Sequence, residues 1–157
     1  MKTASVKDIQ SELEQLDAAR LTELCVRLAK FKKDNKELLT YLLFESFDED
    51  AYVAGIKKYI EEEFAAINTS SLYFVKKSLR RILRTIGKYS RYTGSSTAEV
   101  QLLLHFCAVV KESGIPINDS PVLTNMYRNQ LAKATKLITK MHEDLQYDFL
   151  KELQRLE

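Results

Sequence analysis

The chain has 157 residues, of which 45% are hydrophobic and 29% charged, with only 4 glycines, 2 prolines and 2 cysteines. A chain of this length and composition can bury a core without disulfides, which excludes collagen-like, disordered and disulfide-scaffold proteins. The net charge of +2 indicates no particular class of partner. We therefore expect one soluble domain that covers residues 1–157.

The spacing of the apolar residues predicts an all-α fold, because they recur every three or four positions and nowhere alternate as in a strand. Ser5, followed three positions later by Asp8, predicts the start of a first helix. Its inward face is expected to carry Val6, Ile9, Leu13 and Leu16. Asp17 predicts the N-cap of a second helix, with an apolar stripe made of Leu21, Leu24, Leu28 and Phe31.

The third and fourth helices are predicted from acidic N-terminal signals. Asp34 and Glu37 resemble a capping box, and the apolar run at 38–44 follows them. Because this run is apolar almost all round, we expect the third helix to be the most buried. Three consecutive acidic residues at 48–50 predict the start of a fourth helix, which should extend to about Ile67.

The second half of the chain contains clearer boundaries. Polar residues at 68–71 predict the start of a fifth helix over 72–92, and Ser96 with Glu99 predicts a capping box for a sixth. Ser120 and Pro121 open the last helix, which we expect to run unbroken from Val122 to Leu156. The prediction is six or seven helices in antiparallel hairpins, arranged as an irregular bundle or a short solenoid-like stack, with a long C-terminal helix.

A faint internal repeat accompanies these helices. The apolar pattern between Leu21 and Phe31 recurs 58 positions later between Leu79 and Tyr89. A second, looser match relates residues 37–44 to residues 99–106 at an offset of 62. Two helical hairpins of this kind resemble a short HEAT- or armadillo-like stack. That resemblance implies a binding surface rather than an enzyme, with an irregular bundle of similar helices as the alternative.

Charge is strongly segregated along the chain. Residues 64–98 contain 7 Lys/Arg and no acidic residue, whereas residues 1–63 carry 10 basic and 14 acidic residues. At about 100° per residue, the seven cations fall within an arc of about 140° on the fifth helix, opposite its apolar residues. Tyr73 falls within the same arc. We call these seven residues the basic face: Lys76, Lys77, Arg80, Arg81, Arg84, Lys88 and Arg91.

Three interpretations of the basic face compete. It is an ordinary solvated surface, partly neutralised by the acidic clusters at 48–50 and 61–63, or it binds RNA or DNA phosphates while an aromatic ring stacks on a base. In the third interpretation the basic face binds an acidic protein or an anionic membrane. The membrane is the weakest of these, because the apolar side of the helix is needed for the core and leaves no apolar side chain to insert into lipid. No zinc-finger, RNP or KH signature accompanies the cations.

The residues able to support catalysis are isolated from one another. His105 and His142 have no neighbouring ligand at metal-binding spacing, so a core and a surface role are expected instead. Cys25 and Cys107 lie in apolar stripes as single thiols and are expected to be buried, with a Cys25–His105 nucleophile pair as the alternative. No glycine-rich phosphate loop or serine-hydrolase motif occurs. We therefore expect a protein that is not an enzyme, without metal, cofactor or small-molecule ligand.

The C-terminal helix suggests self-association. Its apolar residues begin with the spacing of a heptad repeat. Five of them could extend beyond the domain and pack on a second copy: Leu145, Phe149, Leu150, Leu153 and Leu156. The N-terminus lacks the apolar stretch of a secretory signal, so a cytoplasmic location without membrane insertion is expected. The overall expectation is a helical interaction or scaffold module that binds a protein partner or itself. The alternative is an RNA- or DNA-binding protein that uses the basic face.

Overall fold

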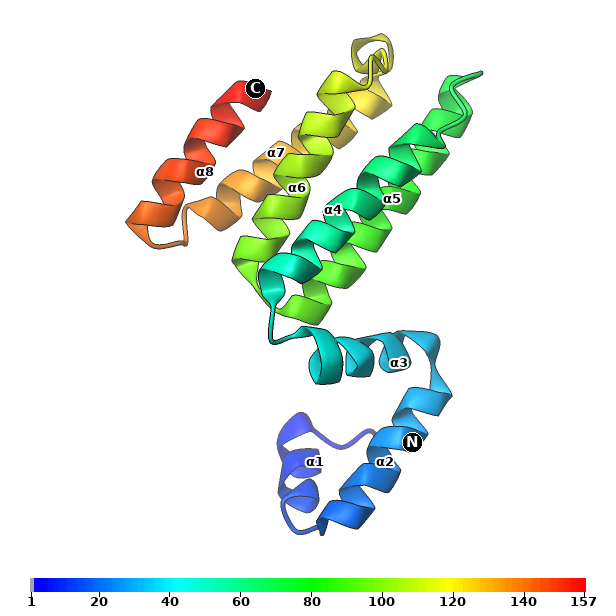
Figure 1. Ribbon diagram of the computed structural model, residues 1–157, viewed down its shortest axis with the longest axis vertical. Helices are drawn as coiled ribbons and strands as arrows, with labels where there is room; N and C mark the ends of the chain where they lie inside the picture. The colour runs from blue at the N-terminus through cyan, green and yellow to red at the C-terminus, as the bar shows by residue number, and fades with distance from the viewer. Residues whose placement is uncertain (1) are drawn as a thin grey trace. The chain divides into compact units, whose positions relative to one another are not determined.

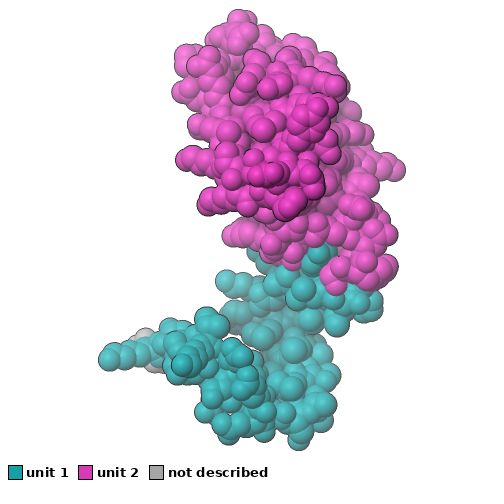
Figure 2. Space-filling model, turned by 90° about the vertical axis from the view of Figure 1, so that its left-hand side faces the viewer, with its two compact units in different colours: residues 1–44 teal, residues 45–157 magenta. Residues whose placement is uncertain are grey.

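The computed structural model describes residues 2–157 and divides the chain into two compact units, residues 1–44 and 45–157 (Figures 1 and 2). That residues 1–157 form one domain stays a prediction. We call the two units the N-terminal unit and the C-terminal unit. The described residues form eight α-helices and no strands, which confirms the all-α prediction and corrects the expected number of six or seven helices.

The N-terminal unit contains three short helices: α1 (Val6–Leu13), α2 (Ala18–Phe31) and α3 (Lys33–Thr40), followed by a π-helical turn at Tyr41–Glu45. The predicted capping box of α1 is present, since Ser5 Oγ accepts from the Asp8 amide and Asp8 accepts from the Ser5 amide.

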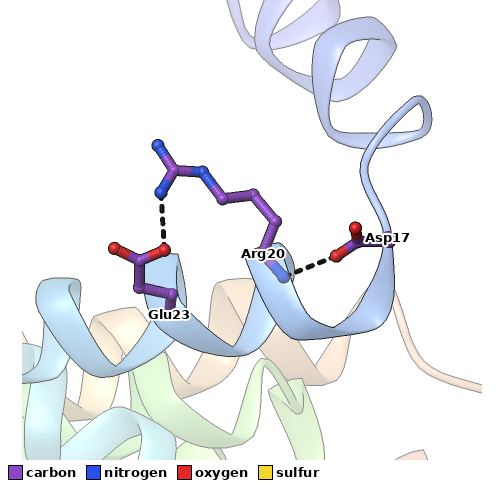
Figure 3. A network of polar contacts seen from close by, with 3 residues as sticks. All are labelled: Asp17, Arg20 and Glu23. Atoms are coloured by element: carbon purple, nitrogen blue, oxygen red, sulfur yellow. Dashed lines mark hydrogen bonds and ion pairs between the residues drawn. The ribbon is translucent and has the colours of Figure 1, made fainter.

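Asp17 caps α2 as predicted. Its Oδ1 accepts a hydrogen bond from the Arg20 amide at 2.7 Å, and the Arg20 guanidinium pairs in turn with Glu23 (Figure 3). The capping box predicted at Asp34 and Glu37 is wrong. The N-cap of α3 is Lys32, whose side chain makes no cap hydrogen bond.

The N-terminal unit has almost no buried residues. Tyr41 is its one buried residue among those described, and no residue of α1, α2 or α3 is buried. Val6 is 82% exposed and Phe44 67% exposed. The predicted inward face of α1 and the expectation that the third helix is the most buried are therefore both wrong. An apolar pattern shows which side chains favour burial, but it does not show which other part of the chain covers them.

The C-terminal unit is a bundle of five helices: α4 (Glu49–Ala65), α5 (Leu72–Thr93), α6 (Ser96–Glu112), α7 (Pro121–Ile138) and α8 (Glu143–Leu156), with a 3-10 turn at Ile117–Asp119. Helix α6 lies in the middle and packs against α4, α5, α7 and α8 (Figure 1). Eight of its 17 residues are buried, and the centre of its Phe106 ring lies 5.5 Å from the centre of the Phe64 ring on α4. The core of the protein is therefore centred on α6.

Two boundaries in this unit differ from the predictions. Helix α4 ends at Ala65, and the cap of α6 is Ser95 rather than Ser96, with Ser95 Oγ accepting from the Ala98 amide at 3.2 Å.

The predicted unbroken C-terminal helix is wrong. It breaks between Ile138 and Glu143, where the amides of Lys140 and Met141 donate to carbonyls three residues back and close the end of α7. His142 then caps α8, its Nδ1 accepting from the Asp144 amide. Neither glycine nor proline marks this turn, so the sequence carried no conventional stop signal. The break allows α8 to fold back onto α6 and α7.

The arrangement of the helices as a stack of repeated hairpins stays a prediction. The proposed repeat relates α2 to α5, yet these helices meet different environments. Ile86 of α5 is buried, whereas its counterpart Leu28 in α2 is 60% exposed.

The C-terminal end of α5 supplies a stability prediction. Gly94 ends α5 with φ +63°, and a Cβ there would meet nothing within 4 Å, so the cost of alanine is conformational rather than steric. We expect Gly94→Ala to lower the free energy of unfolding by about 1–2 kcal/mol, measured by urea denaturation. The matched control is Gly55→Ala in the interior of α4, also without a close neighbour, which should raise it by about 0.5–1 kcal/mol. Equal effects of the two substitutions would contradict this account.

Candidate functional site

Helix α5 presents the basic face on the side away from the core. Its apolar residues Val75, Leu79, Ile82 and Ile86 are buried where α5 packs against α4 and α6. On the other side, five of the seven cations are exposed and two, Lys76 and Lys88, are partly buried. The structure thus places all seven predicted residues on one helix whose position is set by its buried stripe.

The cations differ in their partners. The Arg81 guanidinium pairs with the Glu63 carboxylate at 2.5 Å, and Arg91 Nε donates to the carbonyl of Gly87 at 3.1 Å. Lys88 Nζ lies 5.1 Å from the centre of the Tyr89 ring, a cation–π contact. The structure shows no ion pair within residues 2–157 for the remaining four side chains, which we call the unpaired cations: Lys76, Lys77, Arg80 and Arg84.

The acidic clusters neutralise little of this charge. Glu61 lies 3.1 Å from His105, and Glu62 lies 4.0 Å from Lys58. Asp48 is occupied in capping α4, and Glu49 accepts from Ser95 Oγ at 2.8 Å. In the described part of the chain, the two acidic clusters contact the basic face through the ion pair of Glu63 with Arg81. The Arg81 side chain keeps 56% of its surface exposed and the Glu63 side chain 22%, so this one partly exposed pair leaves most of the positive charge of the basic face unneutralised.

The C-terminal helix leaves the basic face open. Helix α8 packs against α6 and α7, while α5 packs against α4 and α6, so the two lie on different sides of the bundle (Figure 1). The acidic residues of α8 make no ion pair with α5 among the described residues.

Aromatic side chains border the basic face at its N-terminal end. Tyr73 is 66% exposed and forms an edge-to-face pair with Phe74, the ring centres 5.5 Å apart. Because residues three and four apart are neighbours on a helix, Tyr73 lies beside Lys76 and Lys77. The sequence pattern predicted this neighbourhood.

The isolated histidine and thiols lie in different surroundings. Burial lowers the pKa of His105 from its ordinary value, and the nearby Glu61 carboxylate opposes that effect. Burial also raises the pKa of the Cys107 thiol to about 12, whereas Cys25 is exposed, contrary to the expectation that both thiols are buried. Within residues 2–157 no three His, Cys, Asp or Glu side chains are grouped so as to hold a metal ion.

The five residues expected to mediate self-association divide into two groups. Leu153 and Leu156 are buried in the core of the C-terminal unit, and Phe149 packs against that core. Leu145 and Leu150 keep 42% and 37% of their surface exposed. The hydroxyl of the buried Tyr127 donates to the Leu156 carbonyl at 2.7 Å and holds the end of α8 in place. Helix α8 therefore uses most of this apolar stripe within its own bundle.

The sequence analysis missed a groove beside the 3-10 turn. It has a volume of about 830 Å³ and is lined by the end of α6, the segment 115–119, one side of α7 and the last residues of α8. Lys111 lines this groove, and its Nζ donates to the carbonyl of Arg155 at 2.7 Å. No motif in the sequence marks this groove, because α8 reaches it only through the unpredicted break before Glu143.

Comparisons with models of protein families, with curated proteins and with solved structures gave no match. Among the described residues, no helix has the length and apolar character needed to cross a membrane.

The surroundings of His105 predict a pH dependence of stability. The pKa of His105 in the folded protein lies below the ordinary 6.5. As the pH falls through that value, the unfolded chain therefore binds more protons than the folded protein does. The stabilising contribution of neutral His105 is therefore present above pH 6.5 and is lost below it. We expect the urea midpoint of the wild type to fall on acidification through this range, and His105→Gln to reduce the fall. An equal fall in the variant would contradict this assignment.

Proposed function

We propose that this protein is a non-enzymatic helical interaction module that binds a protein partner or a second copy, with the basic face of α5 as its surface for an acidic protein. The observation that carries this proposal is the set of unpaired cations. Four positive side chains without acidic partners lie on one helix, and that helix is held rigid by its buried stripe. Such a surface attracts an acidic partner and fixes its orientation.

The chemistry of the surface favours a folded or extended acidic protein segment. Arg80 and Arg84 carry planar guanidinium groups, each of which can bind one carboxylate through two parallel hydrogen bonds. From Lys76 to Arg91 the basic face extends about 22 Å at about 1.5 Å per residue, a length that several carboxylates of a partner can occupy together. Tyr73 adds an exposed aromatic ring of the kind enriched in protein interfaces.

The state of the reactive groups supports a non-enzymatic role. The raised pKa of Cys107, about 12, keeps this thiol protonated and therefore a poor nucleophile at neutral pH. His105 Nε2 faces Glu61, an acid that offers no nucleophile for the imidazole to activate. Two free cysteines suit a reducing compartment, and we place the protein in the cytoplasm on that basis.

RNA or DNA binding is the second candidate, and the exposed Tyr73–Phe74 pair is the observation that favours it. Single-stranded nucleic acids bind to grooves and faces that combine cations with rings on which bases stack. The unpaired cations next to Tyr73 provide that combination on one helix. Salt distinguishes this candidate from an acidic protein, because release of counterions makes phosphate binding fall steeply with salt.

The experiment is fluorescence anisotropy with three labelled probes: a glutamate-rich peptide, single-stranded RNA and duplex DNA. Each is titrated with the full chain at about 50 and about 200 mM salt, the range over which phosphate contacts weaken most visibly. The proposal predicts that the peptide binds with a modest salt response. Tighter binding of RNA or DNA that collapses at the higher salt would establish the second candidate. No binding of any probe at low salt would contradict both.

Charge reversal on the basic face should abolish this binding selectively. We expect Arg80→Glu with Arg84→Glu to weaken peptide binding by about tenfold or more, equivalent to about 1.4 kcal/mol. The matched control is Arg128→Glu with Lys136→Glu on α7, which makes the same change in net charge at two other exposed positions. Circular dichroism should show both variants folded. Loss of the fold in the α5 variant would show that the basic face is structural.

A further inference from the structure

The turn between α7 and α8 is built from residues that are all compatible with a helix. It consists of residues 139–142, and none of them is glycine or proline. Thr139 keeps helical dihedral angles (φ −61°, ψ −13°), and within residues 2–157 a positive φ occurs only at glycines. His142 leaves the helix through its ψ of 147°, while its φ of −62° is that of a helix. No φ in the turn therefore has to change sign for the turn to become helical.

The apolar residues keep their helical spacing through this turn. Ile138 at the end of α7 is followed by Met141, Leu145 and Phe149, at steps of three, four and four residues. Residues at these spacings lie on one side of a helix, so a helix that continued from α7 into α8 would present them as one stripe. The local sequence thus allows a continuous helix, and the packing of α8 selects the folded-back arrangement.

Contacts with α6 and α7 hold α8 in its folded-back position. Leu153 and Leu156 are buried in the core. The Tyr127 hydroxyl donates to the Leu156 carbonyl and Lys111 Nζ to the Arg155 carbonyl, both at 2.7 Å. A helix of 14 residues is marginal in water without such packing. We call the surface of α6 and α7 that α8 covers, to which Lys111 and Tyr127 belong, the α8 site.

A second copy of the chain is the partner that fits both halves of this contact. When α7 and α8 join into one helix, α8 leaves the α8 site of its own chain, and the apolar residues on both sides lose their cover. A second copy in the same state offers an identical site. There α8 forms the same contacts that it forms within its own chain. No new complementary surface is needed, because the single chain already contains both.

The antiparallel arrangement of α7 and α8 makes the exchange mutual. The two helices are joined by the turn at one end, and Tyr127 in the first half of α7 contacts Leu156 at the end of α8 (Figure 1). When two chains straighten, α8 of each lies antiparallel along α7 of the other, so the two exchanges are related by a two-fold axis. Both α8 sites are then filled, and the assembly closes at two chains.

We propose that two copies of this protein exchange α8 and form a domain-swapped homodimer, in which residues 121–156 of each chain form one continuous helix. This inference rests on the self-association part of the proposed function and assigns it to the apolar stripe of α8. The basic face takes no part in the exchange, because α8 packs against α6 and α7. The dimer therefore presents two basic faces and can bind a divalent acidic partner with increased avidity.

A proline at position 143 distinguishes the two arrangements. Glu143 is the first residue of α8, where proline is favoured, and the extended ψ of His142 is the one preferred before proline. In the continuous helix the same proline lies in the interior, where it removes a hydrogen bond and clashes with the preceding turn. We expect Glu143→Pro to fold and to stay monomeric. The matched control Glu143→Ala loses the same charge and should dimerise as the wild type does.

The mass of the full chain in solution gives the first readout, by sedimentation equilibrium at about 100 µM after prolonged incubation, a range that detects micromolar dissociation constants. One chain has a mass of 18.1 kDa, and we expect a population of twice this mass in the wild type and Glu143→Ala. His142→Ala removes the side chain that accepts from the Asp144 amide and favours the continuous helix. It should raise the association constant about threefold or more. Circular dichroism checks that each variant is folded.

A photochemical cross-link identifies the helix that is exchanged. Lys111 is exposed and lies beside the end of α8, so a benzophenone amino acid in place of Lys111 captures the last turn of α8. Unlabelled chains are incubated with chains labelled with heavy nitrogen, and monomer and dimer are separated before irradiation. We expect cross-links between light and heavy chains in the dimer, and cross-links within one chain in the monomer.

Three results would overturn the exchange of α8. One is the mass of a single chain at about 100 µM for both the wild type and His142→Ala. Another is a dimer that a folded Glu143→Pro forms as readily as Glu143→Ala. The third is a dimer whose cross-links from position 111 to α8 stay within one chain, and this result decides the question if Glu143→Pro does not fold.

The exchange and the proposed binding surface fail separately. A monomer that still binds the glutamate-rich peptide would refute the exchange alone. A domain-swapped dimer that binds no probe would refute the role of the basic face alone.

Discussion

Burial of most of the surface of α6 is the constraint on which the C-terminal unit depends. Eight of its 17 residues are buried, and at about 100° per residue they cover about two thirds of the helix circumference. A helix with so wide an apolar face is stable only when several other helices cover it. The four helices that pack on α6 supply that cover, and each gives it one apolar face. Their opposite faces are left for water, and on α5 that opposite face is the basic one.

The position of the basic face is thus set by the buried residues of α5 and not by contacts that the cations make. Ile82 and Ile86 keep only 0% and 1% of their surface exposed, and their burial fixes the rotation of α5 about its axis. Arg80 and Arg84 lie on the other side of the same turns and therefore remain exposed. The break before Glu143 has a similar consequence, because it returns α8 to α6 and α7 and keeps its acidic residues away from α5. The N-terminal unit has no helix equivalent to α6, and its apolar side chains stay in water.

Several features set by neighbouring residues were predictable from the sequence, although the caps predicted at Asp34 and Ser96 were wrong, and features set by distant residues were not predictable. The caps at Ser5 and Asp17 and the segregated faces of α5 depend on spacings of three or four residues, and the structure confirms them. The apolar run at 38–44 gave no indication of a burial partner, and it is largely exposed. The turn at 139–142 contains neither glycine nor proline, and its stability comes from the packing of α8 that it permits. The exposure of Cys25 was missed for the same reason, since its stripe on α2 has no core to face.

Hydrogen exchange of the full chain, followed by mass spectrometry at low protein concentration, tests most directly the claim that the stability of the protein resides in the core around α6. The account predicts that amides of α6 exchange most slowly, through opening of the whole C-terminal unit, and that amides of α1, α2 and α3 exchange through much smaller openings. Protection of α1–α3 equal to that of α6 under these conditions would contradict it, because it would require a core that joins the two units.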